Sequence, residues 1–259
     1  MTPEKLTEIL YLAENLKKNT RHSWLSNGRR ESVAEHSWRL SLFAYFVKDE
    51  FPNVDMDKVI MMCIFHDLGE AFTGDIPSFY KTSNDEEIEK HKLCEWLNTL
   101  PQPYKDELTS LYKEMDELKT EEAKLWKAMD KLEASIQHNE AEIRTWLPLE
   151  YELNPVYGEK ECGFNEYMKS LQEYTKQLSL DKIAKESKKY CKMHQKVSDF
   201  LVHFFVYHFL RDFYTNSSFN FLPIPFAILS IVFKDGFAQP FSILLISPCA
   251  IPVASESCF

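Results

Sequence analysis

The chain has 259 residues, enough to bury a sizeable core in one large domain or two smaller ones. Its formal net charge of −10 argues against a protein that binds nucleic acid polymers through their phosphates. The sequence contains six glycines, which is few for β-rich or Rossmann-like folds that depend on glycine turns. Leu, Glu, Lys and Met are frequent in the first two thirds, so we expect a mostly helical protein.

The first part of the chain predicts two helices joined by a loop. Apolar residues recur at helical spacing over residues 6–16, and residues 17–30 read as a polar loop. Residues 32–35, Ser-Val-Ala-Glu, have the form of a capping box, in which two side chains satisfy free amide groups at a helix start. The helix that begins there should run to about Lys48.

The next segment predicts a helix that ends beside a cluster of ionisable residues. Asp55 or Asp57 is expected to cap this helix, and Gly69 is expected to end it in a left-handed turn. A loop over residues 73–83 then leads into a helix over residues 84–100.

Two further helical segments follow, and then the composition changes. Residues 104–139 carry an apolar stripe with a break near Thr120, and residues 164–178 form the last amphipathic segment. After position 185 there are six basic and five acidic residues, so the preceding part carries a net charge of −11. We therefore expect a helical domain over residues 1–183 and an irregular, apolar extension over residues 184–259.

The extension has two interpretations. It is either a peripheral appendage that binds a membrane or a partner, or sequence that does not belong to the folded product, and the break in composition favours the second. The apolar run 221–233 is too short to span a bilayer and contains two prolines, so membrane contact by the extension is not expected but stays an alternative.

The cysteines and the N-terminus predict a cytoplasmic protein. The six cysteines show no CxxC pair, and residues 1–16 mix charged with apolar side chains, unlike a signal peptide. Free thiols in a reducing compartment follow from these two features. Apolar faces on the long helices are compatible with a homodimer.

A candidate metal site combines residues from three predicted helices. His66 and Asp67 end a strongly apolar run, His36 lies on the apolar face of the preceding helix, and Asp130 flanks the stripe of a later one. Imidazole and carboxylate suit Mn, Co, Fe or Zn and, less well, Mg. Each residue alone reads more simply as a core histidine or a surface acid, and only the set favours a divalent metal ion.

Two carboxylates follow the predicted metal ligands. A metal lowers the pKa of water bound to it, and an adjacent carboxylate can then accept or donate a proton. Glu70 is the first candidate for that role and Asp75 the second, although Asp75 also reads as a turn residue before proline.

Basic and polar residues near these groups are candidates for substrate contacts. Arg21 could bind a phosphate through its guanidinium, whereas a solvated loop arginine is the simpler interpretation. Weaker candidates are His22, Ser78 and Lys81. His91 and His138 are expected at the surface.

The pattern His36, His66-Asp67, Asp130 resembles the H…HD…D signature of the HD-domain metal-dependent phosphohydrolases. The segments 31–37, 66–77 and 130–134 are similar to the branch that includes the 5′-deoxynucleotidases, and the similarity covers about residues 3–180. The resemblance implies an all-helical HD-domain bundle that hydrolyses deoxynucleoside 5′-monophosphates, a small-molecule nucleotide substrate, to deoxynucleosides and phosphate.

The resemblance also implies roles for individual residues. The metal ligands correspond to His36, His66, Asp67 and Asp130, the catalytic carboxylates to Glu70 and Asp75, and the phosphate-orienting arginine to Arg21. Substrate-holding loop residues correspond to Asp75, Ile76, Pro77 and Ser78. The sequence departs from the bacterial members at His22, where they have tryptophan. Two alternatives stay open: another phosphorylated metabolite as substrate, or a non-catalytic module that binds nucleotide.

Overall fold

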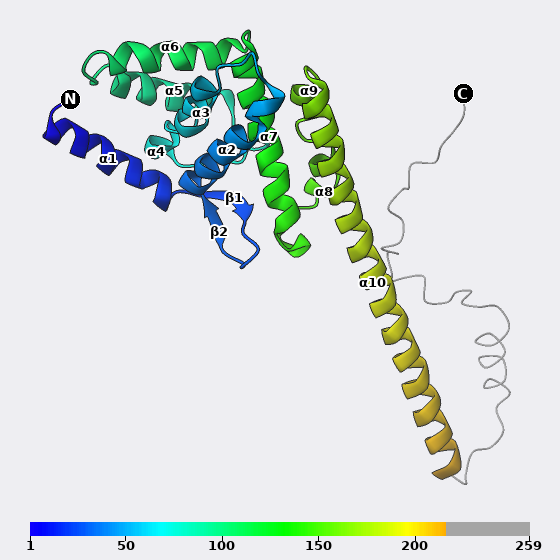
Figure 1. The fold of residues 1–259 in the computed structure, drawn as a ribbon. Coiled ribbons are helices and arrows are strands. Elements are labelled where there is room, and N and C mark those ends of the chain that lie inside the picture. The colour runs from blue at the N-terminus through cyan, green and yellow to red at the C-terminus, as the bar shows by residue number, and fades with distance from the viewer. Residues whose placement is uncertain (216–259) are drawn as a thin grey trace. The chain divides into compact units, whose positions relative to one another are not determined.

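The computed structural model describes residues 1–215, with side chains through residue 208, and this part is helical except for one short hairpin (Figure 1). The predicted all-helical class is confirmed. Contacts within the chain divide it into two units, with the boundary between Ile183 and Ala184.

In chain order the helices and strands are α1 (Pro3–Lys18), β1 (Thr20–Trp24), β2 (Arg30–Ser32), α2 (Val33–Val47), α3 (Met56–Phe65), α4 (Glu70–Thr73), α5 (Ser83–Leu97), α6 (Tyr104–Glu117), α7 (Glu121–Glu140), α8 (Glu150–Leu153), α9 (Glu159–Cys162) and α10 (Glu166–Thr215).

Side-chain caps encoded in the sequence set the starts of the helices that carry the site. Ser32 Oγ accepts a hydrogen bond from the backbone N–H of Glu35, whose carboxylate accepts one from the Ser32 N–H, and this completes the predicted capping box of α2. Asp55 caps α3 by accepting from the backbone N–H of Lys58. Thr120 caps α7, so the predicted break between α6 and α7 is confirmed.

The core lies between α2, α3 and α7, which pack against one another. Leu40, Met62 and Met129 are fully buried there, and burying side chains of this size contributes about 1.5–3 kcal/mol each. His36 lies one turn before Leu40, and His66 lies one turn after Met62. Residues four apart share a helix face, so the faces that form the core also point these histidines inward.

The expectation of a polar loop over residues 17–30 is wrong, because this segment forms a β-hairpin. Strands β1 and β2 pair antiparallel, with Thr20 opposite Ser32 and Trp24 opposite Arg30. The turn contains Asn-Gly, and Gly28 adopts a φ of 86°. An Asn-Gly turn favours two-stranded pairing, and this signal outweighs the polar composition of the segment.

The expected left-handed turn at Gly69 is also wrong. Helix α3 ends at Phe65, and Gly69 has a φ of −56°, in the right-handed helical region. The positive φ of 80° occurs instead at Gly74, which ends α4. Gly69 has a steric role, because a Cβ there would lie 2.8 Å from Cγ of Glu89 on α5.

The last helix is much longer than the sequence pattern predicts. Helix α10 continues from Glu166 through Thr215, so residues 184–215 of the extension are helical. No glycine or proline occurs between Gly163 and Pro223, which leaves no residue that would interrupt the helix. The apolar run 221–233 lies outside the described residues. Within the described part, none of the helices has both the length and the hydropathy of a membrane span.

Candidate metal and substrate site

Four side chains converge where α2, α3 and α7 meet. His36 Nε2 of α2 lies 3.2 Å from His66 Nε2 and 3.2 Å from Asp130 Oδ1 of α7. His66 and Asp67 directly follow α3, and Asp67 Oδ2 lies 3.0 Å from His66 Nε2 and 3.9 Å from His36 Nε2. The structure thus brings together the four residues that the sequence predicts as metal ligands.

The ligand atoms of His36, His66 and Asp67 lie close enough together to hold a metal ion, and Asp130 Oδ1 lies beside both histidines. Ligand atoms about 2.1 Å from one ion lie about 3.0–3.4 Å apart in octahedral or tetrahedral geometry. The separations of 3.0, 3.2 and 3.2 Å fall in this range, and those of 3.8 and 3.9 Å lie slightly outside it. Two imidazoles and two carboxylates are donors that several divalent metals accept, so the donor set supports a divalent ion without selecting one.

Both histidines are oriented by their second ring nitrogen. His36 Nδ1 donates a hydrogen bond to the buried Glu133 carboxylate, and His66 Nδ1 donates to the backbone carbonyl of Cys63 at 2.9 Å. Carboxylates and carbonyls only accept here, so each Nδ1 carries a proton and each Nε2 faces the common point. Such outer contacts are how metal-binding histidines are held in the required tautomer.

The two aspartates are stabilised as carboxylates. Burial favours their neutral forms, but His66 and His36 lower the pKa of Asp67 below its usual range. Burial also raises the pKa of Asp130, but Lys127, whose Nζ donates to Oδ2 at 3.0 Å, acts together with His36 and His66 to lower this pKa well below its usual range. Because metal ligands must be deprotonated, these shifts prepare both aspartates to bind a cation.

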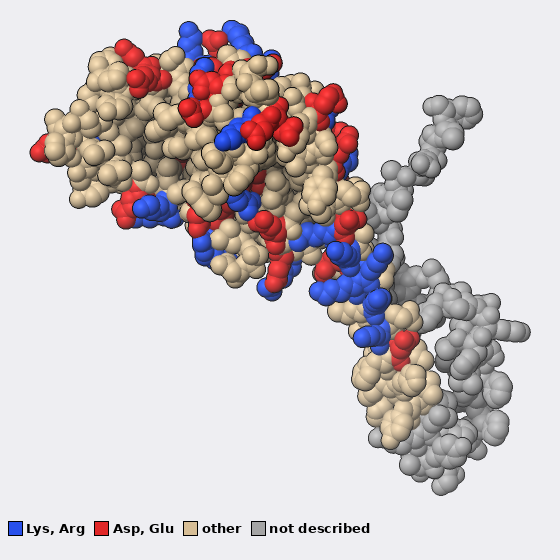
Figure 2. All heavy atoms as spheres, in the orientation of Figure 1, with Lys and Arg blue, Asp and Glu red and all other residues tan. Residues whose placement is uncertain are grey.

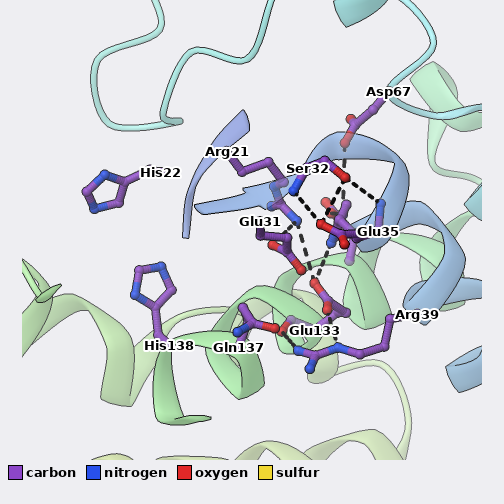
Figure 3. A network of polar contacts seen from close by, with 12 residues as sticks. Arg21, His22, Glu31, Ser32, Glu35, Arg39, Asp67, Glu133, Gln137 and His138 are labelled. Atoms are coloured by element: carbon purple, nitrogen blue, oxygen red, sulfur yellow. Dashed lines mark hydrogen bonds and ion pairs between the residues drawn. The ribbon is translucent and has the colours of Figure 1, made fainter. Parts of the chain in front are cut away.

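A network of charged side chains joins Arg21, Glu31, Glu133 and Arg39 (Figure 3). Arg21 Nη1 lies 3.5 Å from carboxylate oxygens of both Glu31 and Glu133, and Arg39 Nε donates to Glu133 at 2.6 Å. Burial lowers the pKa of Arg21, but these carboxylates more than offset it, so the guanidinium stays charged. Burial and Glu133 raise the pKa of Glu31 to about 7. Glu31, His36 and Glu133 also have ligand-like spacing, but the arginines and the imidazole N–H already pair with them.

A pocket of about 260 Å³ adjoins the four-residue cluster. Asp67 and Asp130 line it, whereas His36 and His66 are buried and do not. All the predicted catalytic and substrate-binding residues also line this pocket: Arg21, His22, Glu70, Asp75, Ile76, Pro77 and Ser78. The structure therefore places the predicted site residues around one cavity.

Two carboxyl groups with raised pKa values lie on this lining. Glu70 begins α4 and is buried, and its Oε2 has no hydrogen-bond partner in the described part of the chain. Burial, followed by the charges of Asp67 and Asp75, raises the pKa of Glu70 to about 10. Burial also raises the pKa of Asp75, against the opposing effect of Arg21. Perturbed carboxyl groups beside metal ligands are typical of proton-transfer sites.

A second polar cluster lies on the same lining, around His22. Its Nε2 lies 3.1 Å from Glu150 Oε1, and His138 Nε2 lies 3.5 Å from the same oxygen. The prediction that His138 is a surface residue is wrong, because its side chain is 13% exposed and burial lowers its pKa to about 4. His91 is 73% exposed, as expected.

Sequence reasoning missed several residues of the site. Lys127 and Glu133 lie three residues before and after Asp130, and this helical spacing could have placed all three on one face of α7. Tyr157 and Glu150 carried no such signal. They reach the pocket because the chain turns back after α7, where the Tyr157 hydroxyl accepts from Lys131 Nζ at 2.8 Å.

A helical domain that brings two inward histidines and two aspartates to one point has the donor atoms of a divalent metal site. The chain belongs to the HD domain family, whose sequence model matches residues 13–172. This result agrees with the resemblance seen in the sequence.

Comparison with known proteins narrows the relationship. The chain is 31% identical over 145 residues to the 5′-deoxynucleotidase HDDC2 of Dictyostelium discoideum, which covers 52% of this chain and 76% of that protein. It is 29% identical over 144 residues to the human protein of the same name, and this match covers 53% of this chain and 68% of the human protein. Among solved structures, a predicted metal-dependent phosphohydrolase from Magnetospirillum magnetotacticum MS-1 matches with a TM-score of 0.59 and 24% identity, over 69% of this chain and 91% of that chain. That structural match supports the fold.

Proposed function

We propose that this chain uses a divalent metal ion to hydrolyse deoxynucleoside 5′-monophosphates to deoxynucleosides and phosphate. The observation that carries the proposal is the pocket, in which two candidate metal ligands, a buried guanidinium and two carboxyl groups of raised pKa share one lining. The two relatives described above, named 5′-deoxynucleotidases, support this choice of substrate.

The metal and the phosphate would be held by different groups. His36, His66, Asp67 and Asp130 would bind the ion, which when present supplies positive charge to a phosphate oxygen and lowers the pKa of the attacking water. Arg21 would bind a second phosphate oxygen, because Glu31 and Glu133 maintain its charge and its side chain lines the pocket.

Glu70 and Asp75 would handle the protons. Hydrolysis removes a proton from water and returns one to the leaving 5′-oxygen, so it needs a group that can exist in both forms near neutral pH. Both carboxyl groups have raised pKa values and lie on the lining next to Asp67. The loop residues Ile76, Pro77 and Ser78 would contact the nucleoside.

A phosphate-release panel tests the function. The full chain, loaded in turn with Mn²⁺, Co²⁺, Fe²⁺, Zn²⁺ and Mg²⁺, should release phosphate from deoxynucleoside 5′-monophosphates and lose this activity in chelator. Release of phosphate from other phosphorylated metabolites, but not from deoxynucleoside 5′-monophosphates, would reject the proposed substrate. Nucleotide binding without phosphate release under every metal would instead favour a non-catalytic module.

Substituting Arg21 by lysine tests the phosphate contact. Lysine keeps the charge between Glu31 and Glu133 but loses the guanidinium fork, so we expect kcat/KM to fall about 10- to 100-fold with unchanged metal content. Steady-state kinetics and metal analysis measure the two effects. Arg144→Lys is the matched control, because Arg144 is 79% exposed and should tolerate the change. Equal kinetics in both variants would exclude Arg21 from the phosphate site.

We also propose a cytoplasmic location and a homodimer. Cys63, Cys94 and Cys162 are free thiols, which fits a reducing compartment. Trp38 and Phe46 on α2 are 63% and 77% exposed, and exposed apolar side chains of this size favour self-association. Light scattering of the purified chain tests the dimer.

A further inference from the structure

Helix α10 has a basic stripe in the part that follows Ile183. Its members are Lys185, Lys188, Lys189, Lys192 and Lys196. At 100° of rotation per residue, these five positions fall within an arc of about 100°. Figure 2 shows lysine side chains gathered along this helix, followed toward its C-terminal end by uncharged side chains. The five lysines share one face only if the segment is helical, so the stripe could not be recognised before the helix was known.

An apolar stripe runs beside the lysines. It consists of Tyr190, Met193, Val197, Phe200 and Phe204, whose exposed fractions range from 47% to 66%. These positions fall within an arc of about 80°, whose centre lies about 110° from the centre of the basic stripe. The helix is therefore amphipathic, with lysines along one border of its apolar face.

From Phe200 onward the apolar surface widens. All residues from 200 to 207 except His203 are large exposed hydrophobics, with exposed fractions of 37% to 68%. Exposed apolar area costs about 25 cal/mol per Å² relative to burial, so a continuous run of this kind marks a surface that contacts something apolar.

We propose that residues 185–207 of α10 bind the surface of an anionic lipid bilayer. Lysines on the border of an apolar face match the negative headgroup layer, while aromatic and aliphatic side chains enter the boundary between headgroups and acyl chains. The described helices do not have the character of a membrane span, so the segment would lie in the interface.

Two other partners fit the helix less well. A nucleic acid would pair with the lysines but would leave the aliphatic side chains Leu201, Val202 and Val206 in water. Two copies of this helix would pair along one apolar seam, and their outer faces would need to be polar. After Phe200 apolar residues surround the helix instead.

Vesicle sedimentation with the full chain tests this proposal. Vesicles of phosphatidylcholine with 30% phosphatidylserine should bind the chain at least about 10-fold more tightly than vesicles of phosphatidylcholine alone, and 0.5 M salt should remove the difference. Equal binding to both vesicle types, or to neither, would overturn the proposal.

Matched charge variants locate the contact. Lys189→Glu with Lys192→Glu should weaken binding to the anionic vesicles at least about 30-fold, because each lysine near the surface contributes about a factor of five. Lys113→Glu with Lys119→Glu makes the same charge change on and just after α6. Lys113 and Lys119 are both 77% exposed, as is Lys189, and this control pair should weaken binding much less. Equal losses in the two pairs would show a general charge effect and overturn the assignment to α10.

An apolar variant and a competition experiment complete the test. Phe200→Ser with Phe204→Ser should weaken vesicle binding at least about 10-fold while circular dichroism shows an unchanged helical content. Unchanged vesicle binding in this variant would contradict an interfacial role for the apolar face. A concentration-dependent dimer that competes with vesicles and is lost in the same variant would instead assign the face to a second copy.

Discussion

Replacing Asp67 by alanine is expected to remove the metal and to lower kcat/KM for phosphate release by at least about 10³-fold. Asp67 Oδ2 lies 3.0 Å from His66 Nε2 and is one of two carboxylate oxygens in the cluster. Its removal leaves the site with one negative charge and three ligands, which lowers both the affinity for a divalent ion and the charge stabilisation that the ion provides. Metal analysis after gel filtration and initial-rate kinetics measure the two losses.

Asp57→Ala is the matched control for this experiment. Asp57 lies in the first turn of α3, the helix that precedes Asp67, and its side chain is exposed. The control should keep its metal and change kcat/KM less than about twofold. Full metal content together with normal turnover in the Asp67 variant would refute the ligand assignment.

Replacing Glu70 by glutamine is expected to lower kcat by about 10²- to 10⁴-fold while the metal stays bound. Glutamine has nearly the same shape but cannot exchange a proton, so the loss reports the proton-transfer role rather than the packing of α4. Unchanged metal content separates this variant from the Asp67 variant. Turnover within about threefold of the original chain would remove Glu70 from the mechanism.

The same substitution is expected to stabilise the metal-free protein. The carboxyl pKa of Glu70 is raised from the ordinary 4.5 to about 10 in the folded chain, so the folded state holds a proton that the unfolded state releases between these values. Stability from this group is therefore lost progressively as pH rises from about 4.5 to about 10. Glutamine removes that loss, and we expect a gain of about 1–2 kcal/mol, or about 2–8 °C in Tm, at pH 8.

Thermal unfolding in chelator at two pH values checks the stability prediction. The Tm difference between Glu70→Gln and the original chain should be close to zero at pH 4.5 and positive at pH 8. Glu173→Gln, an exposed residue of α10, should show no such pH dependence. A difference that is the same at both pH values would mean that the ionisation of Glu70 does not cost stability.

Local sequence signals were enough to predict most of the helices and the metal-ligand candidates. Ser32 and Thr120 could be recognised as helix caps from the sequence, because a capping side chain contacts only the backbone amide three residues further on. His36 and His66 could be placed on inward faces because residues that share a helix face repeat every three to four positions. The roles of these ligands, and of Glu70 and Asp75, stay predictions that the variants above test.

The sequence by itself therefore determined the helical class, the helix starts and the candidate ligands, since these depend on contacts within a few residues. Only the tertiary structure decided that Glu133 orients His36, that Glu150 pairs with His22 and His138, and that Arg21 is buried between two carboxylates. Those contacts join residues far apart in the chain, and their burial and pKa values depend on the packing of α2, α7 and the segment after α7. The basic stripe of α10 belongs to the same group, because its lysines form a single face only in an unbroken helix.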